Sequence, residues 1–153
     1  RPHPAMKLFD LKRTFSFLNL KMMRLEFSDP KVEPVKTFLN CVTVVVSSNS
    51  TILLEAALSR KASIYFEFGV PACRDYYGFV DRGISDMASS PAEILSLIKE
   101  NICQTEARTS SIKHFSYTFG TKWEGREGDL VAMVLGRIIK NKDIEQFDFY
   151  RSF

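Results

Sequence analysis

The sequence predicts an α/β fold, with a Rossmann-like and mainly parallel sheet flanked by helices. The first observation is a continuous apolar run from Val42 to Val46, which is typical of a strand that is buried on both faces. The second is that a small polar loop, Ser47 to Ser50, leads from this run into an apolar helix that begins near Thr51. The third is a second strand, Ser63 to Phe68, directly after that helix. Strands that alternate with helices favour parallel pairing.

The other elements follow from periodicity and from start and stop signals. Ser90-Pro91-Ala92-Glu93 has a capping serine, a proline at the first helical position and a glutamate three residues after the cap, which is a strong helix start. We expect the helix that follows to run to about Ile102, with Ile94, Leu95, Ile98 and Ile102 facing inward. Further helices are expected at Glu33–Asn40, Asp75–Arg82 and Asp129–Lys140, a strand at Met23–Phe27, and loops at Thr105–Ser111 and Gly120–Gly128. Two segments have two interpretations each: a short strand or an extended link at Ile84–Ala88, and a helix or a loop at Phe9–Leu20.

Length and composition describe an ordinary globular domain. The 153 residues fit one domain, and 45% are hydrophobic and 25% charged. A net charge of +3, without a long basic run, argues against a nucleic-acid partner. The cysteines Cys41, Cys73 and Cys103 are far apart and provide no metal framework, so we expect reduced thiols and a cytoplasmic location. No apolar run approaches the length of a membrane span.

The start of the chain leads us to expect that it is a fragment of a longer protein. It opens at Arg1, without a methionine, inside what looks like a motif. The stretch Asp143 to Phe153 is an aromatic and charged tail. We expect this tail to pack back on the domain or on a missing partner.

The loop Ser47 to Thr51 is the first candidate site. A strand that feeds a helix through a Ser/Asn loop presents free backbone N–H groups at the helix N-terminus, which favour an anion such as a phosphate. Ordinary helix capping is the alternative. One cap needs only one such residue, whereas this loop has five in a row.

Two further side chains fit a nucleotide site. Glu55 is the only interior charge of the apolar helix and is suited to accept hydrogen bonds from the two hydroxyls of a ribose; the alternative is a structural carboxylate paired with Arg60, Lys61 or a backbone N–H. His3, held between two prolines, is suited to donate to a phosphate or leaving-group oxygen. The alternative for His3 is an ordinary exposed turn.

Other candidates have simpler interpretations. The aromatic stretch Asp75 to Phe79 provides either a wall of a base or sugar pocket or part of the core. His114, beside Phe115, is interpreted as structural, and Glu124–Gly128 as a solvated turn. The sequence has no P-loop, no GxGxxG motif and no recognisable catalytic triad.

Two short motifs carry a resemblance to a known family. His3-Pro4, followed downstream by the run SNSTILLEAALSRKASIYF, resembles the C-terminal half of GT-B glycosyltransferases, especially bacterial capsule and surface-polysaccharide transferases. The similarity covers most of Arg1 to Ile102 and is sharp at positions 1–4 and 44–66. One departure is that four residues separate Ser50 from Glu55, a longer spacing than in plant-type glucosyltransferases.

The resemblance implies a donor-nucleotide domain for cell-surface glycan synthesis, with a CMP-linked sugar as one candidate donor. It implies that the nucleotide sugar is bound by Arg1, Ser48, Asn49, Ser50, Thr51 and Glu55. It implies that His3 meets the leaving-group phosphate, that no metal is used, and that the catalytic base and the acceptor site belong to a missing N-terminal half. This fragment alone is then inactive, and the enzyme is cytoplasmic or lies at the inner face of the membrane. The alternatives are a nucleotide-sugar epimerase of the same fold and a non-catalytic polysaccharide-assembly domain.

Overall fold

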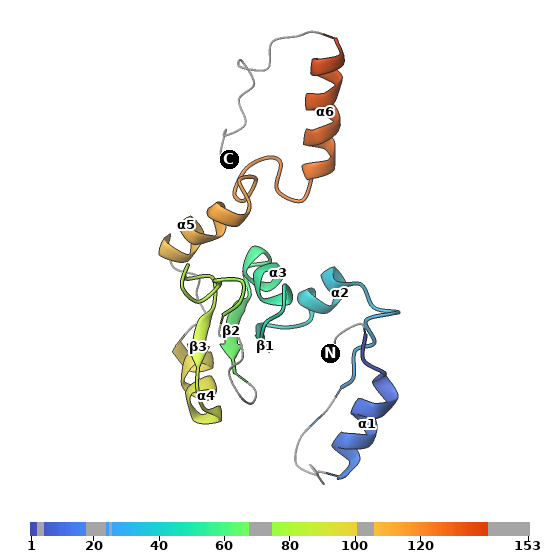
Figure 1. Ribbon diagram of the computed structural model, residues 1–153, viewed down its shortest axis with the longest axis vertical. Coiled ribbons are helices and arrows are strands. Elements are labelled where there is room, and N and C mark those ends of the chain that lie inside the picture. The colour runs from blue at the N-terminus through green and yellow to red at the C-terminus, as the bar shows by residue number, and fades with distance from the viewer. Residues whose placement is uncertain (3–4, 18–23, 25, 68–74, 101–105, 141–153) are drawn as a thin grey trace. The chain divides into compact units, whose positions relative to one another are not determined.

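The computed structural model describes residues 1–2, 5–17, 24, 26–67, 75–100 and 106–140 (Figure 1). The chain divides into two compact units, Arg1–Thr43 and Val44–Phe153. Each unit is described separately below.

The first unit contains two helices, α1 (Leu8–Phe17) and α2 (Val35–Asn40). A polar cluster surrounds Arg1, whose guanidinium donates to Ser28 Oγ at 3.0 Å and lies 3.5 Å from the Glu33 carboxylate. The same guanidinium lies over the ring of Phe38, 5.2 Å from its centroid. An ion pair, a hydrogen bond and a cation–π contact therefore hold the start of the chain against the segment that leads into α2.

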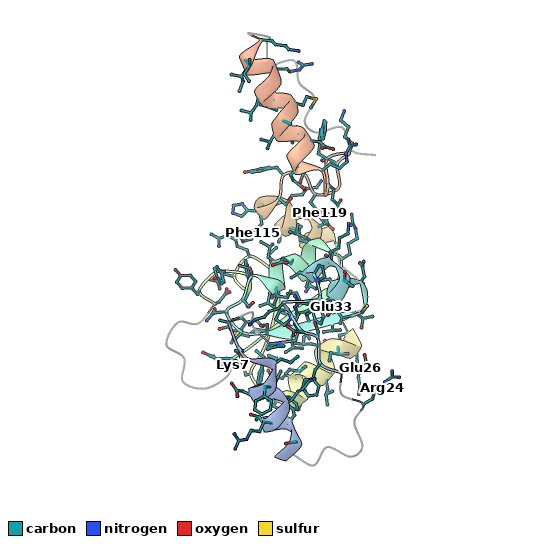
Figure 2. The ribbon with its side chains drawn as sticks, turned by 90° about the vertical axis from the view of Figure 1, so that its right-hand side faces the viewer. Lys7, Arg24, Glu26, Glu33, Phe115 and Phe119 are labelled. Carbon is teal, nitrogen blue, oxygen red and sulfur yellow. The ribbon has the colours of Figure 1, made fainter. Side chains whose placement is uncertain are left out.

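The prediction of a strand at Met23–Phe27 was wrong for Arg24, Glu26 and Phe27, the residues of that stretch that the structure describes. Arg24, Glu26 and Phe27 have no strand pairing. Arg24 and Glu26 instead form an exposed ion pair at 2.7 Å (Figure 2), and Phe27 packs edge-on against Phe15 of α1 with ring centroids 5.7 Å apart. Alternation of apolar and polar residues predicts a strand only where a neighbouring strand accepts its hydrogen bonds.

The second unit is built on a three-stranded parallel sheet, which confirms the predicted α/β class. The strands are β1 (Val44–Ser47), β2 (Ala62–Phe66) and β3 (Asp86–Ala88), in the order β1-β2-β3. Both pairs are parallel, with Val44 opposite Ala62 and Ile64 opposite Asp86. Helix α3 (Ile52–Leu58) packs on β1 and β2, and α4 (Pro91–Glu100) packs on β2 and β3 (Figure 1). The sheet is therefore flanked by helices, as in a Rossmann-like half-domain.

The core lies between α3 and the sheet. Leu53, Ala56 and Ala57 of α3 and Ile64 of β2 are all fully buried. A buried hydroxyl joins these layers, because Ser63 Oγ donates to the Leu53 carbonyl at 3.0 Å and lies 2.6 Å from Ser85 Oγ. Both serines are satisfied in this network, which removes the cost of burying them.

Helix α4 begins as its sequence predicts. The Glu93 N–H donates to Ser90 Oγ at 3.2 Å, and the Glu93 carboxylate accepts from the Ser89 N–H at 2.7 Å. This reciprocal pair resembles a capping box, except that the Glu93 carboxylate accepts from the N–H of Ser89 and not from that of the capping residue Ser90. Ile94 and Ile98 are half-buried, but Leu95 is 61% exposed, so the prediction that Leu95 faces inward was wrong; Ile102 lies outside the described residues.

The helix expected at Asp75–Arg82 is a series of turns. The Asp75 carboxylate accepts hydrogen bonds from the N–H groups of Phe79, Val80 and Asp81, at 2.7 to 3.0 Å. Asp75 and Gly78 have φ values of 47° and 66°, which lie in the left-handed region and are incompatible with a continuous α-helix. The Asp75 carboxylate thus accepts from N–H groups that would donate to backbone carbonyls in an α-helix.

The loop expected at Thr105–Ser111 is helical from Glu106 on, as part of α5 (Glu106–Phe115), and Thr105 lies outside the described residues. Arg108 of α5 donates to Asp86 of β3 at 2.5 Å, and Ile112 is fully buried. Tertiary contacts rather than an apolar stripe therefore hold this polar helix in place. The last helix, α6 (Glu127–Ile139), agrees with the predicted amphipathic helix to within two residues at its start, and the preceding loop is present as expected.

Candidate functional site

The Ser/Asn loop lies at the carboxyl end of a parallel strand. Strand β1 ends at Ser47, which is opposite Tyr65 of β2, and α3 begins at Ile52. In open parallel sheets, ligands bind at this edge. The predicted strand–loop–helix unit is therefore present, and its loop occupies the position at which a ligand is expected.

Capping uses the hydroxyls of this loop only weakly. Thr51 directly precedes α3 and makes no side-chain capping bond. The Ile52 N–H donates to Ser50 Oγ, but at 3.4 Å, which is long for such a bond. By contrast, two side-chain hydrogen bonds, at 2.7 and 3.2 Å, cap the start of α4. The loop thus retains hydroxyl groups that a ligand can use.

Asn49 connects the loop to a second segment. Its Oδ1 accepts the Tyr76 N–H at 2.9 Å, and the buried hydroxyl of Tyr65 accepts the Asp75 N–H at 3.3 Å. These bonds place the turn that starts at Asp75 beside the carboxyl ends of β1 and β2. The Ser/Asn loop and this turn together form what we call the sheet-end site, defined by Ser48–Thr51, Glu55 and Tyr76.

Two exposed tyrosines lie in the turn that starts at Asp75. Tyr76 is 68% exposed and Tyr77 40%, whereas Phe79 is buried. Tyr77 stacks on Phe79 with centroids 5.2 Å apart, and Tyr76 meets Tyr77 edge-on at 5.1 Å. The core interpretation of this aromatic stretch therefore holds for Phe79, and the pocket-wall interpretation fits Tyr76. Nothing in the local pattern distinguished the two, because the turn that Asp75 organises decides which ring points outward.

Glu55 lies in a different environment from the one its sequence suggests. The apolar composition of α3 predicted an interior charge, but Leu54, Glu55 and Leu58 are only half-buried. Thr51 Oγ1 donates to Glu55 Oε1 at 3.4 Å across one helical turn. The Glu55 carboxylate thus lies on the same side of α3 as Thr51, at the sheet-end site, and it remains partly open to water.

The structure does not place Arg1 or His3 at the sheet-end site. Arg1 lies in the first compact unit, where it contacts Ser28, Glu33 and Phe38. His3 lies outside the described residues. The structure therefore brings Ser48, Asn49, Ser50, Thr51 and Glu55 together.

Two of the hollows in the described part of the chain are lined by residues outside the sheet-end site. One, of about 450 Å³, lies in the first unit beside Arg1, Ser28 and Glu33. The other, of about 630 Å³, lies in the second unit beside Arg60, Lys122 and Arg126. Within the described ranges, no three His, Cys, Asp or Glu side chains are grouped to hold a metal ion. None of the helices described is both long enough and apolar enough to cross a membrane.

The segment Glu124–Gly128, expected to be a solvated turn, contributes an ion pair to Arg60, which follows the end of α3. We call the contacts among Arg60, Glu124, Gly120 and Phe119 the Arg60 clamp. Glu124 pairs with both Nη atoms of Arg60, at 2.7 and 3.0 Å, and also accepts the Gly120 N–H at 2.8 Å. The Arg60 guanidinium lies 4.9 Å from the Phe119 ring centroid. Arg60 therefore pairs with Glu124, and the suggested partnership of Arg60 with Glu55 is not observed.

This clamp should make stability depend on pH. The Arg60 hydrogen bond lowers the pKa of Glu124, and the Thr118 hydroxyl lowers the pKa of Glu127. A lowered folded-state pKa gives stability that is present above the unfolded-state pKa and is lost as the pH falls through the folded-state pKa. We expect Glu124→Gln to lower the free energy of unfolding by about 0.5–1 kcal/mol at pH 7, since Arg60 is largely exposed, and by less at pH 3.

Urea denaturation at pH 7 and pH 3 measures this effect. Glu100→Gln, at an exposed position at the end of α4, is the matched control and should change little at either pH. An equal loss for Glu124→Gln at both pH values would show that the carboxylate charge contributes nothing.

The fold and the sheet-end site define an α/β protein with a small parallel sheet and a polar strand-to-helix loop at its carboxyl edge. No family model matches the chain, and neither a curated protein nor a solved structure matches it significantly.

Proposed function

We propose that this chain is the donor-nucleotide-binding half of a GT-B glycosyltransferase that makes a cell-surface polysaccharide. The observation that carries the proposal is the sheet-end site, in which the hydroxyl-rich loop, Glu55 and Tyr76 meet at the carboxyl edge of a parallel sheet. This combination supports nucleotide binding because it offers hydrogen-bond donors for the phosphates, a carboxylate that accepts from the ribose hydroxyls and an exposed aromatic ring for the base. The sequence resemblance supports the transferase class.

In this proposal each residue has a distinct role. Ser50, Thr51 and the backbone N–H groups at the start of α3 receive the donor phosphates, and Ser48 and Asn49 shape the loop around them. The Glu55 carboxylate accepts hydrogen bonds from the ribose. The base lies against Tyr76.

In this proposal, the catalytic base and the acceptor site belong to another part of the enzyme. A base in another part of the enzyme takes the proton of the acceptor hydroxyl, and the sugar leaves a nucleotide phosphate whose growing charge the loop stabilises. The glycan acceptor binds outside this chain, and the enzyme works in the cytoplasm, at the inner face of the membrane.

Isothermal titration calorimetry of the chain with CMP, CDP, UDP, GDP and ADP tests the proposal. We expect one nucleotide to bind, and Ser50→Ala and Glu55→Ala each to weaken it by about tenfold, since each removes a hydrogen bond to a charged partner. Ser96→Ala and Glu100→Ala, at exposed positions of α4, are the matched controls and should bind like the parent chain.

The outcomes separate the proposal from its alternatives. Selective binding of CMP would identify a CMP-linked donor, while binding of another nucleotide would identify a different donor class. No binding of any nucleotide at millimolar concentration would contradict the donor site and favour a non-catalytic interaction domain. Binding that Ser50→Ala and Glu55→Ala leave unchanged would place the nucleotide elsewhere on the chain.

A further inference from the structure

The hollow of about 630 Å³ in the second unit, which we call the basic hollow, has an excess of positive charge. Its lining contains three cations, one carboxylate and two uncharged residues: Arg60, Lys122, Arg126, Glu124, Gly120 and Thr121. Glu124 is already engaged, because it accepts from both Nη atoms of Arg60 and from the Gly120 N–H. The Arg60–Glu124 pair is neutral as a whole. The other two cations therefore leave two positive charges that no carboxylate of the lining balances.

Lys122 has its ammonium group available for a ligand. The side chain is exposed, and it makes no hydrogen bond or ion pair with any of the described residues. The ammonium lies over the ring of Trp123, 5.4 Å from the centroid. An ammonium group has three hydrogen-bond donors, and all three remain for an acceptor in the basic hollow.

Arg126 also retains most of its donors. Its Nε donates to Asp129 at 2.9 Å, but the two side chains are 62% and 63% exposed, and an exposed pair of this kind contributes little. Its two Nη groups have no acceptor in the described part of the chain. The guanidinium lies 5.7 Å from the centroid of the Trp123 ring, and Trp123 is buried. One fixed ring therefore carries both of the available cations of the lining.

The neighbouring charges do not remove this excess. Glu127 and Asp129 are not part of the lining, and Glu127 accepts from the Thr118 hydroxyl and the Gly125 N–H. Lys113 of α5 adds a further cation beside the basic hollow, because a Cβ added to Gly120 would lie 3.9 Å from the Lys113 Cε. The basic hollow is therefore suited to an anion.

We propose that the basic hollow binds the phosphate group of a phosphomonoester, with Lys122 and Arg126 as donors and with Arg60 still paired to Glu124. A phosphomonoester carries about 1.5 to 2 negative charges near neutral pH and so matches the two unbalanced cations, whereas a carboxylate carries one. The planar guanidinium binds two phosphate oxygens, and the ammonium binds a third. The volume exceeds what one phosphate needs and leaves room for the molecule that carries it.

The basic hollow is separate from the sheet-end site. It lies beside Arg60, beyond the last residue of α3, whereas the Ser/Asn loop precedes the first residue of that helix. The proposal therefore goes beyond the proposed nucleotide site and does not depend on it. A soluble sugar phosphate and phosphatidic acid in a lipid surface present the same chemical group, so the experiment includes both.

Trp123 gives a direct readout, because it is the only tryptophan of the chain and both proposed donors lie over its ring. We expect glucose 6-phosphate to change its fluorescence, and glucose and glucuronate to leave it unchanged. Lys122→Gln and Arg126→Gln should each raise the dissociation constant, measured by calorimetry, about five- to tenfold, since each removes a charge-assisted hydrogen bond. Lys99→Gln, at an exposed position of α4, is the matched control and should bind like the parent. Circular dichroism verifies that the fold of each variant is unchanged.

Glu124→Gln should change the affinity in the opposite direction. It removes the one carboxylate of the lining and leaves the charge of Arg60 unbalanced, so it should tighten binding of glucose 6-phosphate by at least about threefold. The same substitution is expected to lower the stability of the chain. A purely structural role of the Arg60 clamp would not tighten binding.

Phosphatidylcholine vesicles with and without phosphatidic acid separate the two sources of the phosphate. Binding of glucose 6-phosphate in solution supports a soluble ligand, and co-sedimentation only with vesicles that contain phosphatidic acid supports a lipid, provided that Lys122→Gln weakens the binding. No response to either probe, with glucose 6-phosphate tested up to about 10 mM, would overturn the proposal. So would equal binding of glucuronate, binding that neither Lys122→Gln nor Arg126→Gln weakens, or weaker binding by Glu124→Gln than by the parent chain.

Discussion

Leu53→Ala should lower the free energy of unfolding of the chain by about 3 kcal/mol, the typical cost of removing a fully buried leucine side chain. Leu53 has no exposed surface and lies in α3, which packs on β1 and β2. The Leu53 carbonyl also accepts the Ser63 hydroxyl. A cavity at this position weakens the contact that fixes α3 on the sheet.

Because α3 carries Glu55 and follows the Ser/Asn loop, this loss should also reach the proposed nucleotide site. Chemical denaturation measures the stability, and Leu95→Ala is the matched control, since Leu95 is 61% exposed and should cost less than about 1 kcal/mol. Equal losses for Leu53→Ala and Leu95→Ala would contradict the position of Leu53 in the core.

The elements that the sequence predicted well are those with continuous apolar runs. The strand within Val42–Val46, the helix from Thr51 and the strand within Ser63–Phe68 correspond to β1, α3 and β2. These apolar runs carry the signal for the type of element by themselves. They predicted the extent of burial less well. The prediction of a strand with both faces buried was wrong for β1, which lies at the edge of the three-stranded sheet and has Val46 38% exposed.

The elements that were missed are held by distant side chains. Helix α5 is polar and depends on the Arg108–Asp86 ion pair and on Ile112, so its own pattern resembled a loop. The turn that starts at Asp75 depends on which backbone groups one carboxylate accepts. Tertiary contacts of this kind override local propensity, and a single sequence does not reveal them.

The candidate site divides in the same way. The loop residues Ser48–Thr51 were predictable because hydroxyl-rich residues between a strand and a helix have a local physical meaning. Tyr76 was recognised only as part of an aromatic stretch, because its position depends on the hydrogen bond of its N–H to Asn49, 27 residues earlier. The orientation of Glu55 depends on which side of α3 faces the sheet, which the nearly uniform apolar composition of that helix concealed.

Asp75→Ala should lower the free energy of unfolding by about 2–3 kcal/mol, because it removes the acceptor of three backbone N–H groups at once. Alanine also tolerates the φ of 47° at this position less well than aspartate does. Asp75→Asn keeps one side-chain oxygen and accepts the left-handed conformation, so it should cost less than half as much. Asp81→Ala, at an exposed residue of the same turn, is the control and should stay within about 0.5 kcal/mol.

Nucleotide affinity in the same variants links this turn to the sheet-end site. If the Asp75 turn positions Tyr76, Asp75→Ala should weaken nucleotide binding under conditions in which the variant remains folded, while Asp81→Ala should not. Tyr76→Ala should weaken binding without the loss of stability, because its ring is 68% exposed. The opposite pattern, with destabilisation by Tyr76→Ala and unchanged binding in Asp75→Ala, would show that the turn supports the fold alone and that the base lies elsewhere.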